Sequence, residues 1–562
     1  MGYIRVRERE QETLLPGSVE DYVSQDNPVR VIDAFVDGLD MQAAGFERYV
    51  PARTGRPAYD PRDLLKLYLY GYLNRVRSSR MLMRECGRNV ELFFLLNHAQ
   101  PDFRTIADFR KRNRKAIQAV FREFVGVCGD LKLLGTDTAV IDGTKIRAVN
   151  SKKRSFTPEI LKKKLAYLAE QERQVEGYLG DLDTADEAGE PCLSLSKDKA
   201  QEKLTALRQR AKKYRGYAKH LSQTGEKQVL ETDPEAYTMH TKDGLFPCYN
   251  VQTAVEDKNH IITAFLTTSL NNDQGLLHST AEEARKAVGT ESIHVIADRG
   301  YESRPDIEHC MLDGIIPDVG FKYDKEERIH VIDYVPTDIT PELRASSKPA
   351  DIRTCLHAGV LPDCYQTSSI RVELQHLGKM SCFLRHANGR VTCPMGRELF
   401  KRTTRANGGT DYSSREACRT CPNRCTQSKG TKTVRFGPDT AYVPVVMYGS
   451  SHYDLQPLPK DPPHPPGNNF NRLPKESARI MLYLRRNDAL QQHRKTVVEH
   501  PFGTIKWHDG AYHFLCKGKE MVSAETALAF TAYNLRRAIN LVGTEALLRY
   551  FHAKKKLINE MA

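Results

Sequence analysis

Two short apolar runs, each ending in an aspartate, constrain the fold of this chain most. Val140–Ile141 leads into Asp142, and Ile293–Ala297 leads into Asp298. A short, continuous apolar run bounded by turn residues is typical of a buried strand, so each run predicts a strand that ends at a carboxylate. Together with Glu499, far along the chain, these positions predict an α/β fold that brings three acids together.

The residues between the two runs predict further strands and helices. Residues 249–255 alternate between apolar and polar, and residues 261–266 run back after a turn, as in an antiparallel hairpin. Residues 278–288 and 305–312 have helical patterns, and a last strand is expected from Ile315. This order resembles that of an RNase H-like core, with a mixed five-stranded sheet and helices.

Residues 1–135 predict an all-α domain ahead of this core. Asp60 supplies an N-cap and Pro61 a first-turn proline for one helix, and Ser78–Ser79 can cap a second. Thr105 opens a third helix in a pattern that resembles a capping box. We therefore expect this segment to be a compact helical domain.

The third helix carries a basic run, in which Arg110 and Arg112 are the candidate DNA contacts. A solvated face explains many such runs. Contact with the DNA backbone is the alternative, because the run lies on a helical domain next to a carboxylate site.

Two long segments interrupt the strand pattern. Residues 151–228 are rich in Lys, Glu, Gln, Leu and Ala, and residues 324–474 are rich in Pro, Gly, Asp and Thr. Helices are expected again over 476–499 and 524–542. The expected division is a helical N-terminal DNA-binding domain (1–135), the first strand of the core (136–150), a helical hairpin insert (151–228), the continued core (229–323), a Cys-rich insert (324–474) and the C-terminal helices of the core (475–562).

Composition narrows the class of protein. Lys and Arg number 84 against 71 Asp and Glu, a net charge of +13 that suits a polyanionic partner, although a basic chain without such a partner is the alternative. No apolar run is long enough to span a bilayer, so a cytoplasmic protein without a membrane partner is expected. The 13 cysteines are then expected to be reduced thiols.

Three carboxylates held together repel one another unless a cation lies between them. Hard oxygen ligands favour Mg²⁺ or Mn²⁺ over Zn²⁺. Two such ions, about 3.5–4 Å apart, activate water or a DNA 3′-hydroxyl and stabilise the leaving oxygen. A single aspartate at a strand end is more often a turn or cap residue, so the metal-site hypothesis depends on Asp142, Asp298 and Glu499 jointly.

Several segments resemble the catalytic blocks of bacterial insertion-sequence transposases of the DDE type. These are Asp142–Lys145, Tyr249–Val255, Asp298–Tyr301 and Val498–Lys506. The stretch from Tyr59 to Arg112 resembles the InsH-type N-terminal domain of the same proteins. The resemblance covers most of the chain, in the family's order.

The resemblance implies an enzyme that cuts DNA at the ends of its element and joins the 3′-hydroxyls to target DNA. Asp142, Asp298 and Glu499 would be the ligands of two Mg²⁺ or Mn²⁺ ions. It also implies double-stranded DNA as the partner, a homodimer or higher oligomer that pairs two ends, and a bacterial, nucleoid-associated location. The N-terminal helical domain is expected to recognise the ends.

Relatives often carry Tyr-x2-Arg-x3-Glu-x6-Lys around the last acid. At those spacings this chain has Gln492, Lys495, Glu499 and Lys506, so only the Glu and the Lys match. Lys506 can contact a phosphate as a point charge, and Arg494 is the candidate substitute for the missing arginine. The further DNA-contact candidates are Lys495 and Arg299. Arg299 either contacts phosphate or braces its loop, and Tyr301 either stacks on DNA or braces the same loop.

Four cysteines offer a tetrahedral structural zinc site: Cys393, Cys418, Cys421 and Cys425, with Cys382 or His386 as a spare. Free thiols are the alternative. If zinc is bound, it would replace the core that this loop-rich insert is expected to lack.

The lone tryptophan, Trp507, follows Lys506. It either stacks on a flipped base or packs the last helix against the core, which is the commoner role of such a residue. Two other functions compete with the transposase: a metal-dependent DNA nuclease on the same fold, and a non-catalytic, zinc-containing DNA-binding regulator.

Overall fold

The computed structural model consists of two compact units. The first comprises Met1–Asp273, Lys286–Val288 and Arg494–Ala562, and the second comprises Gln274–Arg285 and Gly289–His493. The residues that the structure describes are 18–50, 57–135, 137–151, 154–188, 197–321, 327–334, 337–365, 370–378, 382–385, 390–393, 397–406, 408–421, 430–436, 445–446, 456–457 and 476–561.

The first unit begins with helices. The predicted cap of α2 is confirmed: the Asp60 side chain accepts a hydrogen bond from the backbone N of Arg62 at 2.8 Å, and Pro61 occupies the first turn. A further helix, α1, precedes it and was not predicted. The helices are η1 (Val19–Tyr22), α1 (Pro28–Asp37), α2 (Pro61–Leu73), α3 (Ser79–Glu85), α4 (Val90–Leu96), α5 (Phe103–Arg112) and α6 (Arg114–Asp130).

The capping box predicted at Thr105 is wrong, because α5 begins earlier. Asp102 is its N-cap, and one carboxylate oxygen accepts hydrogen bonds from the backbone N of Arg104 at 2.8 Å and of Thr105 at 3.2 Å. Asn113 separates α5 from α6. The basic run is therefore divided between two helices.

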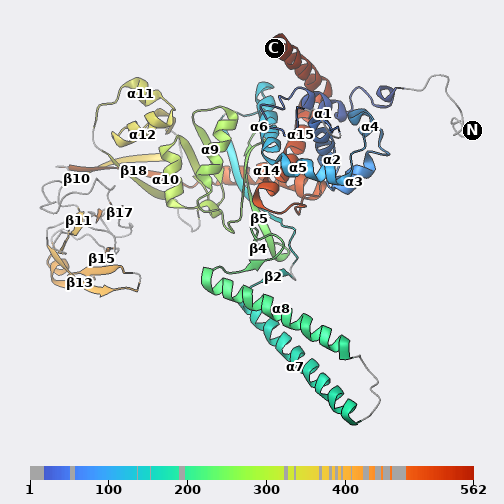
Figure 1. Ribbon diagram of the computed structural model, residues 1–562. Helices are drawn as coiled ribbons and strands as arrows, with labels where there is room; N and C mark the ends of the chain where they lie inside the picture. Colours follow the sequence, from blue (N-terminus) through green and yellow to red (C-terminus); the bar gives the residue numbers. More distant parts are fainter. Residues whose placement is uncertain are drawn as a thin grey trace, which may run out of the picture. The chain divides into compact units, whose positions relative to one another are not determined.

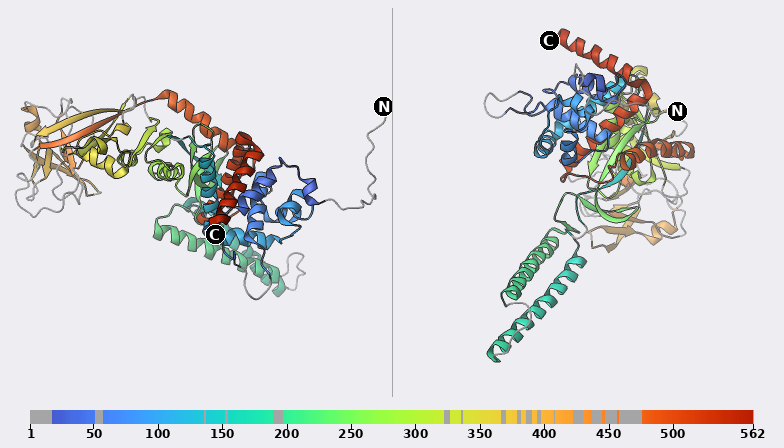
Figure 2. Two further views of the ribbon diagram at one scale, coloured as in Figure 1. Left: turned by 90° about the horizontal axis from the view of Figure 1, so that it is seen from above. Right: turned by 90° about the vertical axis from the view of Figure 1, so that its right-hand side faces the viewer.

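The last helix of the chain belongs to the same core as these N-terminal helices. α15 (Lys519–Met561) packs against α1, α2 and α6, as Figures 1 and 2 also show. The rings of Phe35 and Phe124 meet edge to face at 5.1 Å between centroids, and Phe551 lies 5.6 Å from Phe35. Gly543, with φ of 81°, interrupts the helical backbone of α15.

The first unit also holds antiparallel strands: β1 (Thr138–Arg147), β4 (Tyr237–Thr241), β5 (Gly244–Glu256) and β6 (Ile262–Thr268). The predicted hairpin is confirmed as β5 and β6. The expectation that the first strand ends at Asp142 is wrong. Asp142 lies opposite Thr253 in the middle of β1, and the pairing continues to Arg147 opposite Cys248.

Two long helices, α7 (Pro158–Ala188) and α8 (Lys197–Thr224), lie side by side in the first unit (Figure 1). Their shared core contains Leu168, Val175, Ala200, Leu207 and Ala211. The short strands β2 (Ser155–Phe156) and β3 (Val229–Leu230) pair beside them. Helices were expected in this segment. The apolar residues recur along one side of each helix, and these two sides pack against each other.

The second unit contains the predicted alternation of helices and strands. Its elements are most of α9 (Leu277–Val288), β7 (Ile293–Ala297), η3 (Arg299–Tyr301), α10 (Arg304–Leu312) and β8 (Ile315–Val319). β7 and β8 are parallel, with Ala297 opposite Val319. The chain is thus a mixed α/β protein with antiparallel and parallel strand pairs and a helical N-terminal part.

A three-stranded antiparallel sheet contradicts the helix predicted from Glu476. Its order is β10 (Ile370–Gly378), β18 (Glu476–Arg485) and β9 (Glu327–Tyr334). β18 is rich in helix formers, but it pairs on both edges and buries Ile480, Leu482 and Leu484 on alternate positions, so tertiary pairing overrides local preference. The same unit contains α11 (Pro341–Ala345), α12 (Pro349–His357) and η4 (Asp363–Tyr365).

The Cys-rich segment, expected to be an insert of loops and strands without a core, contains a seven-stranded sheet. Its buried cluster consists of Phe383, Val391, Leu399, Tyr412, Val434 and Phe436. The elements are β11 (Cys382–Arg385), β12 (Val391–Thr392), β13 (Glu398–Thr404), β14 (Thr410–Ser413), α13 (Arg415–Arg419), β15 (Thr433–Phe436), β16 (Val445–Val446) and β17 (Gln456–Pro457).

Two elements lie between β18 and α15: α14 (Asp488–Gly503) and the π-helical turn η6 (Thr504–His508). Within the described ranges, every helix is too short or too polar to cross a membrane.

Candidate functional site

Asp142 lies on β1 and forms an ion pair with a residue 352 positions away. Arg494 Nη1 donates a hydrogen bond to Asp142 Oδ2 at 3.0 Å, and the two side chains are 13 % and 24 % exposed. Thr253 Oγ1 donates to the Asp142 backbone oxygen at 3.0 Å, which ties this point of β1 to β5. The first acid is therefore half-buried and already paired with a cation.

Arg494 and Glu499 lie on the same helix, α14, but on different faces. The buried residues Val497 and Val498 separate them, and Glu499 is exposed together with Lys495, which precedes it by one turn. Arg494, and not Glu499, is therefore the residue of α14 that contacts β1 at Asp142.

Lys506, on η6, also contacts β1. Its Nζ donates to the Lys145 backbone oxygen at 3.2 Å, across 361 positions of sequence. Burial lowers the pKa of Lys506 below its ordinary value, although the Asp142 carboxylate counteracts part of that effect. Two cations from the segment around Glu499 therefore reach the strand of Asp142.

A cluster of polar side chains, Asp273, Asn250 and Gln252, lies beside Asp142 and was not predicted. Asp273 Oδ1 accepts hydrogen bonds from Asn250 Nδ2 at 2.8 Å and from Gln252 Nε2 at 2.7 Å. A Cβ at Gly143 would lie 2.6 Å from Asp273 Oδ1, so a larger residue there would have to displace the Asp273 side chain. The two buried amides on alternate positions of an apolar strand were the available signal.

Asp298 lies in the second unit, directly after β7. Its Oδ1 accepts a hydrogen bond from the backbone N of Gly300 at 2.7 Å, which caps η3. Arg299 is exposed, whereas Tyr301 is fully buried. Tyr301 therefore braces its loop, and the alternative that it stacks on DNA is wrong.

The strands β7 and β8 are clipped together beside Asp298 by Gln491. Its Nε2 donates to the Ala297 backbone oxygen at 3.2 Å and to Asp318 Oδ1 at 3.1 Å. Burial raises the pKa of Asp318 from 3.8 to about 6, against the effect of the Gln491 hydrogen bond. The second unit thus contains a buried carboxyl group that resists ionisation.

We expect Asp318→Asn to stabilise the second unit at high pH only. Because the folded pKa lies above the unfolded one, the protonated acid favours folding below about pH 4, and this contribution is lost as pH rises through about 6. Asparagine keeps the acceptor for Gln491 without the charge. Urea unfolding should show a gain on the order of 2–3 kcal/mol at pH 8 and little change at pH 4.

The exposed Asp338 provides the matched control. Asp338→Asn should leave the unfolding free energy unchanged at both pH values. An equal gain for the two variants would show that Asp318 is not the titrating group.

The two N-terminal arginines differ in position. Arg110 is 7 % exposed, its Nη1 donates to the Tyr72 hydroxyl at 3.3 Å, and its guanidinium lies 5.3 Å from the centre of the Tyr68 ring. The expectation that Arg110 faces DNA is therefore corrected: this side chain packs α5 against α2. Arg112 is exposed.

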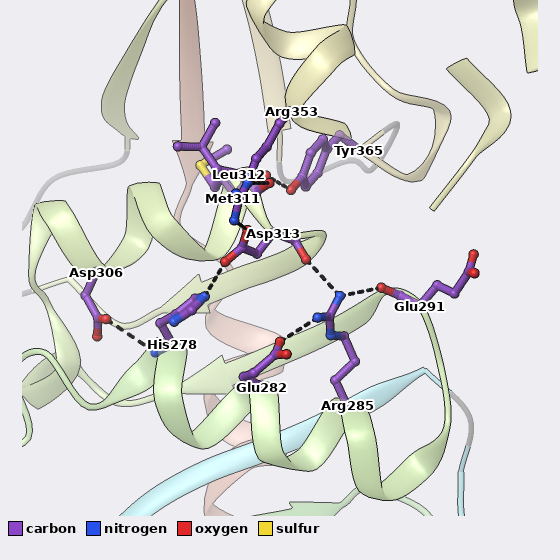
Figure 3. A network of polar contacts seen from close by, with 10 residues as sticks. All are labelled: His278, Glu282, Arg285, Glu291, Asp306, Met311, Leu312, Asp313, Arg353 and Tyr365. Atoms are coloured by element: carbon purple, nitrogen blue, oxygen red, sulfur yellow. Dashed lines mark hydrogen bonds and ion pairs between the residues drawn. The ribbon is translucent and has the colours of Figure 1, made fainter. Parts of the chain in front are cut away.

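A polar network in the second unit joins α9, the end of α10 and α12 (Figure 3). His278 Nε2 contacts Asp313 Oδ2 at 2.7 Å, Arg353 pairs with the other oxygen, and Arg285 Nη1 donates to the Asp313 backbone oxygen at 3.0 Å. Although burial opposes it, hydrogen bonds from Arg353 and His278 lower the pKa of Asp313. The network holds the helices together, and its residues were not predicted.

The cysteine cluster is described only in part. Cys393 packs against the buried cluster of the seven-stranded sheet, Cys418 lies on α13, and Cys421 follows that helix. Cys425 and His386 lie outside the described residues, and Cys382 begins β11. In the part of the chain that the structure describes, no three His, Cys, Asp or Glu side chains are grouped as for a metal ion. The zinc site stays a prediction.

Comparison with known proteins assigns the helical start of the chain. Residues 17–112 match the family model of a transposase domain, Transposase domain (DUF772). The match extends from η1 to the end of α5. A search of curated proteins found no match. The family model therefore supports an insertion-sequence transposase, with its transposase domain in the helices from η1 to α5.

Proposed function

We propose that this protein is a DDE transposase that cuts at the ends of its insertion sequence and joins the 3′-hydroxyl ends to target DNA. The transposase-domain match supports the class, and the resemblance of four segments to DDE blocks supports the chemistry. Asp142, Asp298 and Glu499 are the proposed metal ligands, on an RNase H-like core. Double-stranded DNA is the proposed partner, bound by an oligomer that pairs two ends.

One observation supports the proposal most strongly. In the segment that contains Glu499, Arg494 contacts Asp142 and Lys506 contacts Lys145, each across more than 350 positions of sequence. Two of the resembling blocks, the first and the last, therefore meet on one strand. Folding has no evident need for two partly buried cations at this strand, whereas phosphoryl transfer uses positive charge beside a carboxylate site.

The residues fit divalent ions in their chemistry. The Asp142 carboxylate offers hard oxygen ligands, and the Arg494 guanidinium shows that a positive charge is favoured there. Bound Mg²⁺ or Mn²⁺ would supply activation of water or a 3′-hydroxyl and charge stabilisation at the leaving oxygen. Lys506 is the proposed contact for one phosphate, and Arg494 is the proposed contact for a second one once it leaves Asp142.

Arg494 should therefore compete with the metal. We expect Arg494→Gln to tighten Mn²⁺ binding severalfold, because the variant removes a cation 3.0 Å from Asp142 Oδ2. Isothermal titration calorimetry without DNA measures this directly. Lys495→Gln, at the exposed neighbouring position, is the control and should leave Mn²⁺ affinity unchanged. Unchanged or weaker binding by Arg494→Gln would contradict a metal ligand at Asp142.

A strand-transfer assay tests the function. The intact protein and Glu499→Gln are incubated with labelled DNA from the ends of its own element, target DNA, and Mg²⁺ or Mn²⁺. Because Glu499 is exposed, the substitution should preserve the fold. We expect joined products from the parent and none from the variant, with equal DNA binding. Cutting without joining would indicate a nuclease, and binding without cutting would indicate a regulator.

A further inference from the structure

Three exposed arginines gather on one face of the β13–β14–β15 sheet in the Cys-rich segment. Arg402 belongs to β13, Arg405 follows β13 at the turn into β14, and Arg435 belongs to β15. β14 lies between the other two strands, and its Asp411 is directly opposite Arg435. The alternate positions of β14 and β15 belong to the buried cluster on the other side of the sheet. This surface, the arginine face, therefore takes no part in the core.

Each arginine of this face is anchored through its Nε atom. Arg402 Nε donates a hydrogen bond to Ser413 Oγ at 3.1 Å. Arg405 Nε and Arg435 Nε donate to the two carboxylate oxygens of Asp411, at 3.3 Å and 2.7 Å. Ser413 and Asp411 are buried, although the arginines that cover them are exposed. The three guanidinium groups are therefore fixed over a buried hydroxyl and a buried carboxylate.

The anchoring leaves the outer nitrogens of the guanidinium groups for a ligand. Within the described residues, every side-chain hydrogen bond of these arginines comes from Nε, so their Nη1 and Nη2 donors are unused. Hydrogen bonds from Arg435 and Arg405 lower the pKa of the Asp411 carboxyl. Three guanidinium groups against one carboxylate leave an excess of positive charge. Because the groups are already held, a ligand loses little binding free energy in ordering them.

Exposed aromatic rings do not by themselves define a binding surface here. Trp507, on η6, is 76 % exposed, so the expectation that it packs the last helix against the core is wrong. Phe400 is 57 % exposed and lies opposite Ser413 on the arginine face. Single exposed apolar side chains are common on protein surfaces, and one ring is too small a patch for an apolar protein interface. Charge therefore decides which ligand the arginine face fits.

We propose that the arginine face binds the phosphodiester backbone of duplex DNA. The proposal rests on the proposed function, which supplies DNA as the partner but assigns its contacts to other residues. A guanidinium group presents paired donors in the geometry that phosphate oxygens accept. Arg402 and Arg435 are two strands apart, about 10 Å between backbones, so each can contact a different phosphate. The net charge of +13 favours a long polyanion over a short acidic peptide.

Neighbouring residues of β13 provide a matched pair of variants. Arg402→Gln removes one positive charge from the arginine face. Lys401→Gln removes one exposed positive charge from the position opposite Tyr412, on the other side of the sheet. The full-length proteins are titrated with a fluorescein-labelled duplex of about 30 base pairs and arbitrary sequence, at salt concentrations from about 50 to 300 mM. Anisotropy gives the dissociation constant at each concentration.

We expect the slope of log K against log salt to become shallower by about 0.9 for Arg402→Gln and to stay unchanged for Lys401→Gln, because only a phosphate contact releases counterions. Arg402→Gln/Arg435→Gln should lose about twice as much slope, and Arg402→Lys should keep the slope of the parent. Equal slopes for Arg402→Gln and Lys401→Gln would overturn the proposal. Competition by polyglutamate as strong as by unlabelled duplex would also overturn it, because the face would then bind any polyanion.

The same variants separate this inference from the proposed function. Normal strand transfer by the parent, with an unchanged salt slope for Arg402→Gln, would refute the arginine face alone. A shallower slope for Arg402→Gln, in a protein that neither cuts nor joins DNA, would refute the proposed function and leave the arginine face in place.

Discussion

We expect Asp298→Asn to abolish strand transfer while the protein stays folded. The asparagine side chain keeps an oxygen that accepts from the backbone N of Gly300, so the cap of η3 survives and only the charge is lost. We expect joined product to fall by about 10³-fold or more, as when one member of a catalytic unit is removed. Gel analysis of joined labelled DNA measures the loss.

Asp298→Ala separates the two roles of this carboxylate. It should lose activity equally and also lose about 1 kcal/mol of stability, because alanine cannot cap η3. DNA binding by both variants should match the parent. Strand transfer by Asp298→Asn at the level of the parent would show that Asp298 is not a metal ligand.

Glu525→Gln is expected to cause the largest loss of stability. Glu525 accepts hydrogen bonds from the backbone N of Leu515 and Cys516 at about 3.0 Å and pairs with Arg77 at 3.4 Å, with both side chains buried. The variant leaves the Arg77 guanidinium without its counter-charge, which in buried pairs costs about 3–5 kcal/mol. Urea unfolding followed by circular dichroism measures the change.

Glu520→Gln, on the same helix, is the matched control. Glu520 pairs with Arg114, but both side chains are exposed, so the loss should stay within about 0.5 kcal/mol. The double variant Arg77→Met/Glu525→Gln should lose less than the sum of the single variants, because no buried charge is left alone. Similar losses for Glu525→Gln and Glu520→Gln would refute a buried pair.

Elements with local signals were predictable from sequence. The Asp60 cap, the hairpin of β5 and β6, and the separate strands β7 and β8 have their causes in neighbouring residues. β18 was not predictable, because its strand state depends on partners 98 or more positions away. The Cys-rich sheet was missed for a related reason: its short strands are stable only when paired with one another.

The candidate site shows the same limit. The resemblance to the DDE blocks indicated Asp142, Glu499 and Lys506, but it did not indicate how α14 is rotated. Rotation decides that Arg494 reaches Asp142 while Glu499 stays exposed. Likewise, the burial of Arg110 depends on Tyr68 and Tyr72 of α2, which the basic run itself does not reveal.

The packing of α15 against the N-terminal helices has a consequence for synthesis on the ribosome. Phe551 completes the cluster of Phe35 and Phe124, and Thr544 Oγ1 donates to the Asp26 backbone oxygen at 3.0 Å. The first helices to be translated therefore lack part of their core until the last helix emerges. A chain that terminates before α15 therefore lacks the residues that complete the core of α1, α2 and α6.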